Sequence, residues 1–191
     1  MIEPFFTQHF EKPARPPEPL NMKIHHPAVQ RIYDEYGVKT SKTGLFRVVD
    51  PEEWQASYLP WFYLMRDEED IFGGPELYPF MTTAFGQAYI FANLPDEDLV
   101  GFVDVTSNFN VMGSARTFFL RHLNDPIFHE YNLYGNLVDE LAPAGPLLPS
   151  ECYGFFPPLA IGGEASLESV QRVKLREHLD ILAQVGGCPF E

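Results

Sequence analysis

The sequence predicts an α+β fold, in which helices pack against an antiparallel sheet. Two segments rich in aromatic residues and threonine, 78–84 and 87–92, are typical of strands, and Gly86 between them indicates a turn or bulge. A third apolar segment, 99–105, returns after a turn at 93–97. No helical pattern separates these segments, and parallel strands need long crossover connections, so we expect a hairpin-built sheet.

The N-terminal part contains a proline-rich segment followed by a short helix. Four prolines fall within residues 10–20, which predicts an extended arm with few backbone donors. Residues 27–36 have a helical apolar pattern and are predicted to form a short helix. Pro27 suits its first position, and Gly37 suits the residue after it.

The next elements are a strand and a second helix. Residues 45–49 are mostly apolar and include two β-branched valines, which predicts a strand. Asp50 is a suitable N-cap for a helix that begins at Pro51 and carries Trp54 and Tyr58. Because proline lacks the backbone donor of a helix interior, we expect this helix to end near Pro60.

Two further helices are expected in the C-terminal half. The segment 126–142 follows the capping residue Asp125, and we expect one continuous helix despite Gly135. Its apolar residues recur every three or four positions and are predicted to face the core: Ile127, Tyr131, Tyr134, Val138 and Leu141. The last helix covers about 175–185, with His178 on or beside its apolar side.

We expect three consecutive regions. An N-terminal arm covers 1–26, a second region covers 27–110, and a C-terminal region covers 111–191. The second and third regions are expected to form one compact unit, since 191 residues suit one domain or two small lobes.

The composition excludes several classes of protein. With 45% apolar and 15% aromatic residues, the chain has too many core-forming side chains for a disordered protein. A net charge of −14 does not suit nonspecific binding of nucleic acid, which needs a basic surface. No apolar run is long enough to span a membrane, and we expect a cytoplasmic protein with no membrane partner. The pairing of Cys152 with Cys188 stays open, although free thiols are favoured.

The acidic residues are unevenly distributed. No Lys or Arg occurs between Arg66 and Arg116, whereas this stretch holds many carboxylates. A solvated face that keeps the protein in solution is one interpretation, and a surface that attracts a basic partner is the other. For a partner, the predicted contacts are two acidic clusters and two aromatic side chains expected to be exposed: Asp67, Glu68, Glu69, Asp70, Asp96, Glu97, Asp98, Trp61 and Tyr63.

The sequence contains no established catalytic or metal-binding motif. GxSxG, GxGxxG, P-loop and HExxH patterns are absent, and the cysteines do not form a CxxC pair. We therefore predict no catalytic residue, metal ligand or cofactor. One alternative is a small hydrolase that uses Glu151 or Asp139 with His178, which would require these groups to meet in a cleft. A general protein-interaction or regulatory module is a second alternative.

The C-terminal part resembles a known family. The segment from Leu148 to Val185 resembles the Tdi-type C-terminal domain of type VI secretion immunity proteins that protect against a DNA-cleaving toxin. The similarity is carried by a YGF motif, a GG pair and an HLxIL motif. The matching residues are Glu151, Tyr153, Gly154, Phe155, Pro158, Leu159, Ala160, Gly162, Gly163, Glu168, Val173, His178, Leu179, Leu182, Ala183 and Gln184.

The N-terminal half resembles the GAD-like domain that usually precedes that C-terminal domain. The similarity lies in YGVKTSKTGLFRVVDPEEW, residues 36–54, and in the segment 83–91, where Gln87 stands in place of a frequent acid. Together the resemblances imply a non-enzymatic immunity protein whose partner is a cognate basic nuclease toxin. The shared residues are mostly Gly, Pro and aromatic, so they define turns and core positions and leave the contact residues unassigned.

Overall fold

The computed structural model describes residues 3–22, 24, 26–63, 76–93, 98–106 and 109–186, with the side chains of 3, 62, 63, 76 and 93 outside this description. The helices are α1 (Glu3–His9), α2 (Pro27–Glu35), α3 (Pro51–Tyr63), α4 (Ala115–Leu120), α5 (Pro126–Tyr131), α6 (Gly135–Leu141) and α7 (Leu175–Val185). The strands are β1 (Lys39–Thr40), β2 (Phe46–Val48), β3 (Glu76–Thr83), β4 (Ala88–Asn93), β5 (Asp98–Val103), β6 (Phe109–Ser114), β7 (Glu151–Phe155) and β8 (Val170–Lys174).

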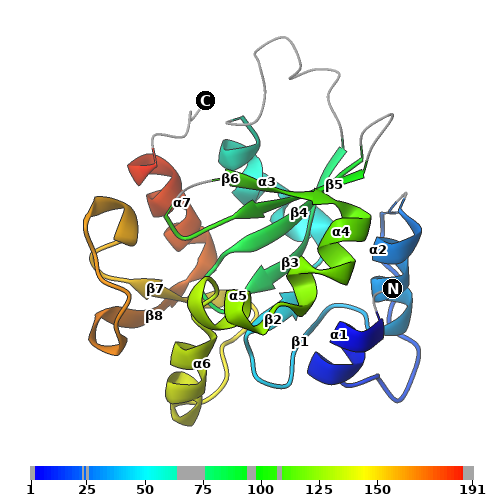
Figure 1. The fold of residues 1–191 in the computed structure, drawn as a ribbon, viewed down its shortest axis with the longest axis horizontal. Coiled ribbons are helices and arrows are strands. Elements are labelled where there is room, and N and C mark those ends of the chain that lie inside the picture. Colours follow the sequence, from blue (N-terminus) through cyan, green and yellow to red (C-terminus); the bar gives the residue numbers. More distant parts are fainter. Residues whose placement is uncertain are drawn as a thin grey trace.

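The strands confirm the predicted α+β class. Strands β1 to β6 form one sheet in chain order, and each neighbouring pair is antiparallel. Strands β7 and β8 pair separately as a second antiparallel sheet (Figure 1). The expected turn between β3 and β4 contains Gly86 with a positive φ of 77°, a conformation that glycine adopts without a steric penalty.

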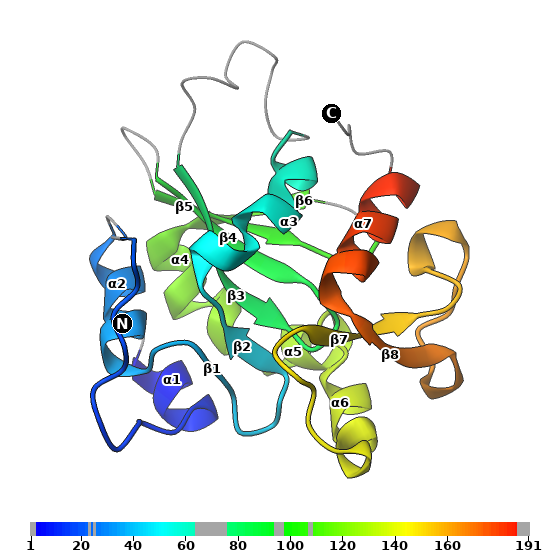
Figure 2. The same cartoon turned by 180° about the vertical axis from the view of Figure 1, so that it is seen from behind.

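Helices cover both faces of the larger sheet. The alternation of side chains along β4 sends Tyr89 and Phe91 into one apolar cluster and Ile90 into the other. The first cluster includes residues of α1, α2 and α4, and the second includes residues of α3 and α7. Figure 2, the view from behind, shows α3 and α7 in front of the sheet. Both faces of the central strands are therefore apolar, as expected for a buried sheet.

The N-terminal segment is part of the core. Residues 11–20 have neither helix nor strand, in keeping with the prolines, but residues 3–9 form α1. Phe5, Phe6 and Phe10 are at most 2% exposed. Phe5 meets the ring of Phe46 on β2 edge to face, with 5.0 Å between ring centroids. Burial of an aromatic side chain stabilises a fold by about 1.5–3 kcal/mol, so α1 is integrated into the domain.

The helix α3 is longer than expected. It begins at Pro51 as predicted, but it continues past Pro60 to Tyr63. Trp61 is fully buried, and the hydroxyl of Tyr58 donates a hydrogen bond of 3.0 Å to the Gly86 carbonyl. These contacts with the core outweigh the roughly 3 kcal/mol that an interior proline costs a helix.

The predicted single helix over 126–142 is wrong. The chain forms α5, turns through Tyr134 in a left-handed conformation with φ of 56°, and restarts as α6. Close packing at the turn needs Gly135, because a Cβ there would lie 2.9 Å from the His129 carbonyl oxygen. As a result, Ile127 and Tyr131 are 67% and 68% exposed and do not face the core.

The smaller sheet docks on the turn between β3 and β4. The Tyr153 amide donates a hydrogen bond of 2.7 Å to the Ala84 carbonyl. The rings of Phe85 and Phe155 stack with 4.9 Å between centroids. The helix α7 covers the predicted residues 175–185, follows β8, and buries Leu175, Leu179 and Leu182. Among the described residues, no helix is long and apolar enough to cross a membrane.

Candidate functional site

Most of the predicted partner contacts fall outside the part of the chain that the structure describes. This applies to Asp67, Glu68, Glu69, Asp70, Asp96, Glu97 and the side chain of Tyr63. Their role in binding stays a prediction.

The expectation that Trp61 is an exposed anchor is wrong. Its side chain is 0% exposed and belongs to the apolar cluster between the sheet, α3 and α7. The ring of Tyr58 lies 6.0 Å from it, centroid to centroid. The error follows from the early end expected for α3, because residues beyond Pro60 were then expected to lie in a loop. Trp61 in this conformation stabilises the fold and is not available to a partner.

Asp98, at the start of β5, has a partner within the chain. Its Oδ2 lies 3.1 Å from the His26 Nε2, and the two side chains are 42% and 16% exposed. The same His26 caps α2, since its Nδ1 accepts a hydrogen bond from the Val29 amide, and its ring packs on Phe91 at 4.7 Å. Asp98 therefore contributes to the junction between α2 and the sheet, with an exposed part of its carboxylate left for a partner.

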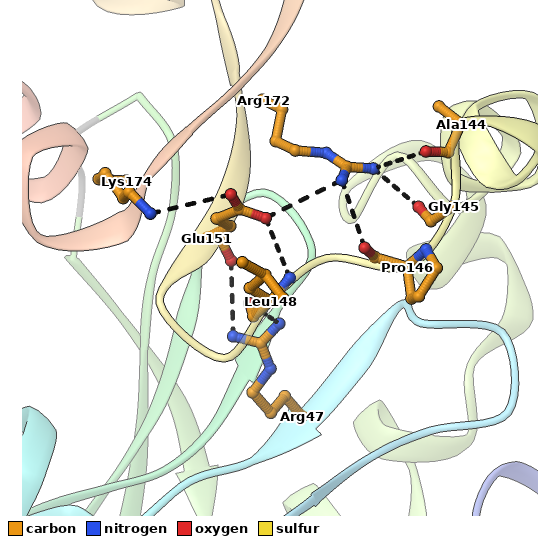
Figure 3. Close-up of polar contacts among 8 residues, drawn as sticks. All are labelled: Arg47, Ala144, Gly145, Pro146, Leu148, Glu151, Arg172 and Lys174. Carbon is orange, nitrogen blue, oxygen red and sulfur yellow. Dashed lines mark hydrogen bonds and ion pairs between the residues drawn. The ribbon is translucent and has the colours of Figure 1, made fainter.

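Glu151 lies among three basic side chains (Figure 3). Its Oε2 lies 3.9 Å from the guanidinium of Arg172, and its Oε1 lies 3.9 Å from the ammonium of Lys174. Oε2 also accepts a hydrogen bond of 3.0 Å from the Leu148 amide. Because its oxygens already have these partners, the carboxylate is positioned to hold the chain that enters β7.

The two arginines at this cluster bind backbone carbonyls. Arg47 on β2 donates to the carbonyls of Pro149 at 2.6 Å and Leu148 at 3.1 Å. Arg172 on β8 donates to the carbonyls of Ala144, Gly145 and Pro146 at 2.8–3.3 Å (Figure 3). We call this arrangement the arginine clasp, defined by Arg47, Arg172 and Glu151. It fixes the segment 144–151 between α6 and β7.

Of the two pairs in the hydrolase alternative, Glu151 with His178 shares one cavity, and Asp139 with His178 does not. Glu151 and His178 line a cavity of about 320 Å³ beside α7, whereas Asp139 lines a separate one beside α5. The His178 Nδ1 has no hydrogen-bond partner among the described residues, so no carboxylate orients the ring there. Burial lowers the pKa of His178 to about 4, which is typical of a histidine packed in the core.

The thiol of Cys152 is also buried. Burial raises the pKa of the Cys152 thiol to about 12, so the thiol stays protonated and is a poor nucleophile. Cys152 is free, and Cys188 lies outside the described residues. In the described parts of the chain, no three His, Cys, Asp or Glu side chains come together as metal ligands would.

A surface around α5 and α6 was missed by the sequence reasoning. A cavity of about 350 Å³ lies beside the two helices, and its lining includes Glu130, Asp139 and His129. We call it the α5–α6 cavity. His129 is 9% exposed, and its Nε2 has no hydrogen-bond partner in the described structure. Burial, with a smaller effect of the nearby His9, lowers the pKa of His129 to about 4.

One sequence signal points to this surface. No Lys or Arg occurs between Arg121 and Arg172, a stretch as free of basic residues as the one between Arg66 and Arg116. The acidic residues in it are Asp125, Glu130, Asp139, Glu140, Glu151, Glu164 and Glu168. This signal did not lead to a predicted binding surface, because the continuous helix expected over 126–142 placed Ile127 and Tyr131 in the core.

The protein is of the α+β class. Its six-stranded antiparallel sheet has its strands in chain order and lies between helical layers. The fold is similar to the crystal structure of Atu4351 from Agrobacterium tumefaciens, with a TM-score of 0.55 and 16% sequence identity over 96% of this chain and 89% of that chain. At this identity the likeness shows the fold alone.

The sequence comparison is more specific for the C-terminal part. Residues 114–186 match the family described as "T6SS immunity protein Tdi1, C-terminal". The match runs from the last residue of β6 through α7, so it includes α5, α6 and the smaller sheet, whereas His9, Thr43 and Leu45 of the α5–α6 cavity lie outside it. It confirms that part of the resemblance found in the sequence, for a segment shorter than half of the chain. No curated protein matches the chain.

Proposed function

We propose that this protein is a cytoplasmic immunity protein that binds a cognate DNA-cleaving type VI secretion toxin and neutralises it without catalysis. The family match over residues 114–186 is the observation that carries the proposal. An immunity role requires a toxin partner, and the resemblance of residues 36–54 to a GAD-like domain is consistent with such a protein.

Charge favours a nuclease as that partner. A nuclease presents positive charge to DNA, whereas this chain has a net charge of −14. Complementary charge speeds the encounter of two proteins and rejects unsuitable partners. An anionic protein seated on the DNA-binding face would also exclude DNA from it.

Co-expression with the nuclease encoded by the neighbouring gene tests the proposal. We expect the protein to restore growth of cells that make the toxin, to co-purify with it at 1:1 stoichiometry, and to block cleavage of plasmid DNA. Association should slow as salt rises, since ions screen the charges that guide the encounter. Failure to bind the neighbouring toxin and to protect cells would contradict the proposal.

The acidic clusters remain our predicted contacts within this function. Asp67→Lys with Asp70→Lys, and Asp96→Lys with Glu97→Lys, should each weaken toxin binding. The pair Glu164→Lys with Glu168→Lys is the matched control, because both side chains are exposed and the change in net charge is the same. If the control pair weakens binding as much, net charge rather than position determines the affinity.

A further inference from the structure

The first observation is an apolar pair on the outer face of α5. Ile127 and Tyr131 are 67% and 68% exposed, and a spacing of four residues places their side chains side by side on the helix. Exposed aliphatic and aromatic side chains become the centre of protein interfaces when a partner removes them from water. The flanking residue Glu130 is acidic and exposed.

The second observation is the electrostatic character of the neighbouring α5–α6 cavity. Its lining contains two exposed carboxylates, Glu130 and Asp139, and no Lys or Arg among the residues described there. Lys42 precedes the lining residue Thr43, but its ammonium donates to the carbonyls of Thr7 at 3.4 Å and Gln8 at 2.9 Å. Neither carboxylate makes an ion pair with any residue that the structure describes.

The third observation is a buried acceptor in the lining. The His129 ring packs against Phe46 with 5.0 Å between centroids, and its Nε2 has no hydrogen-bond partner in the described structure. A hydrogen bond to the Leu123 backbone favours the protonated ring, which identifies the ring as its donor. In a neutral imidazole one nitrogen donates and the other accepts, so Nε2 is left as an unpaired acceptor.

These features complement one chemical group. A guanidinium carries several donors and no acceptor, so it matches a site built of carboxylates and an acceptor nitrogen. We infer that the surface of α5 and α6 is a toxin-contact surface in which an arginine of the cationic toxin enters the α5–α6 cavity, between Glu130, Asp139 and His129. Ile127 and Tyr131 pack on apolar residues around that arginine. This inference rests on the proposed function and assigns its binding surface.

Binding of the neighbouring nuclease to paired variants tests the assignment. Glu130→Lys with Asp139→Lys should weaken binding by at least about a hundredfold, because an arginine would meet two like charges. Ile127→Ala with Tyr131→Ala should weaken it by about tenfold or more. The matched controls are Glu164→Lys with Glu168→Lys, and Ile161→Ala, which removes an apolar side chain of similar exposure elsewhere in the family-matched region.

His129→Phe separates the cavity from the rest of the surface. The variant keeps a ring against Phe46 but removes the acceptor and also the ring's hydrogen bond to the Leu123 backbone, so the thermal midpoint should fall by a few degrees while binding falls by about tenfold. Circular dichroism and thermal unfolding of every variant identify loss of folding. The lysine and alanine variants, which change exposed side chains, still test the inference if His129→Phe is unstable.

The outcomes distinguish the inference from the proposed function. If the wild-type protein binds no neighbouring nuclease, the proposed function fails and the inference falls with it. If the wild type binds but the Glu130 and Asp139 variant binds equally well, or the control pair loses as much, only the inference is overturned. Selective loss in the α5–α6 variants supports it.

Discussion

Removal of the Arg47 guanidinium tests the arginine clasp. The variant Arg47→Met keeps much of the apolar stem on β2 but deletes the donors to the Pro149 carbonyl at 2.6 Å and the Leu148 carbonyl at 3.1 Å. A third contact, to the Glu151 carbonyl, is 3.5 Å long and is counted as negligible. At about 1 kcal/mol for each of the two good bonds, we expect a loss of about 2 kcal/mol.

Urea unfolding followed by circular dichroism measures that loss. In a domain of this size it corresponds to a fall of about 4–8 °C in thermal midpoint. Arg116→Met is the control, since Arg116 is exposed on α4 and makes no hydrogen bond or ion pair with the described residues. A loss below about 0.5 kcal/mol for Arg47→Met, or an equal loss for the control, would refute the clasp as a stabilising feature.

Three other changes test the packing of the core. Gly154→Ala should cost about 1–3 kcal/mol, because its Cβ would lie 2.7 Å from a carbon of the His178 ring; the double variant with His178→Ala should lose less than the sum of the single losses in urea unfolding. Trp61→Ala should cost about 3–5 kcal/mol in the same assay, whereas Trp61→Phe should keep both the fold and toxin binding. Acid should destabilise the protein between pH 6.5 and about 4. In this range the histidines of the unfolded chain bind protons, whereas the buried rings of His129 and His178 stay neutral because burial lowers their pKa to about 4. The free energy of unfolding should fall by about 2–3 kcal/mol per ring by pH 4, and this effect is absent above pH 6.5. Replacing both histidines by apolar residues should flatten that part of the stability profile, and an unchanged profile would contradict the burial of neutral rings.

The regular elements were predictable because their signals are local. The helix α2 has Pro27 at its start and Gly37 with a positive φ just past its end, and both residues act through their own backbone geometry. The β3–β4 hairpin likewise follows from Gly86 between two strand-forming segments. Pattern and turn chemistry agree at these places, so sequence alone determined the structure.

Long-range packing explains the elements that were not predicted. The continuation of α3 past Pro60 depends on the burial of Trp61 against α7, which lies more than a hundred residues away in the chain. The break between α5 and α6 depends on Gly135, which allows close approach to the His129 carbonyl. The spacing of apolar residues gives no information about a backbone contact of this kind. The apolar residues of α5, Ile127 and Tyr131, were therefore predicted to face the core.

The same break creates the candidate binding surface. A continuous helix would have directed Ile127 and Tyr131 inward, and burying such side chains stabilises a domain by about 1.5–3 kcal/mol each. The fold leaves this stabilisation unused, and the buried Nε2 of His129 has no hydrogen-bond partner among the residues that the structure describes. Both become favourable only when another molecule removes the apolar pair from water and supplies a donor. We therefore propose this surface, beside carboxylates that make no ion pair with the described residues, as the one that binds a basic partner with apolar side chains.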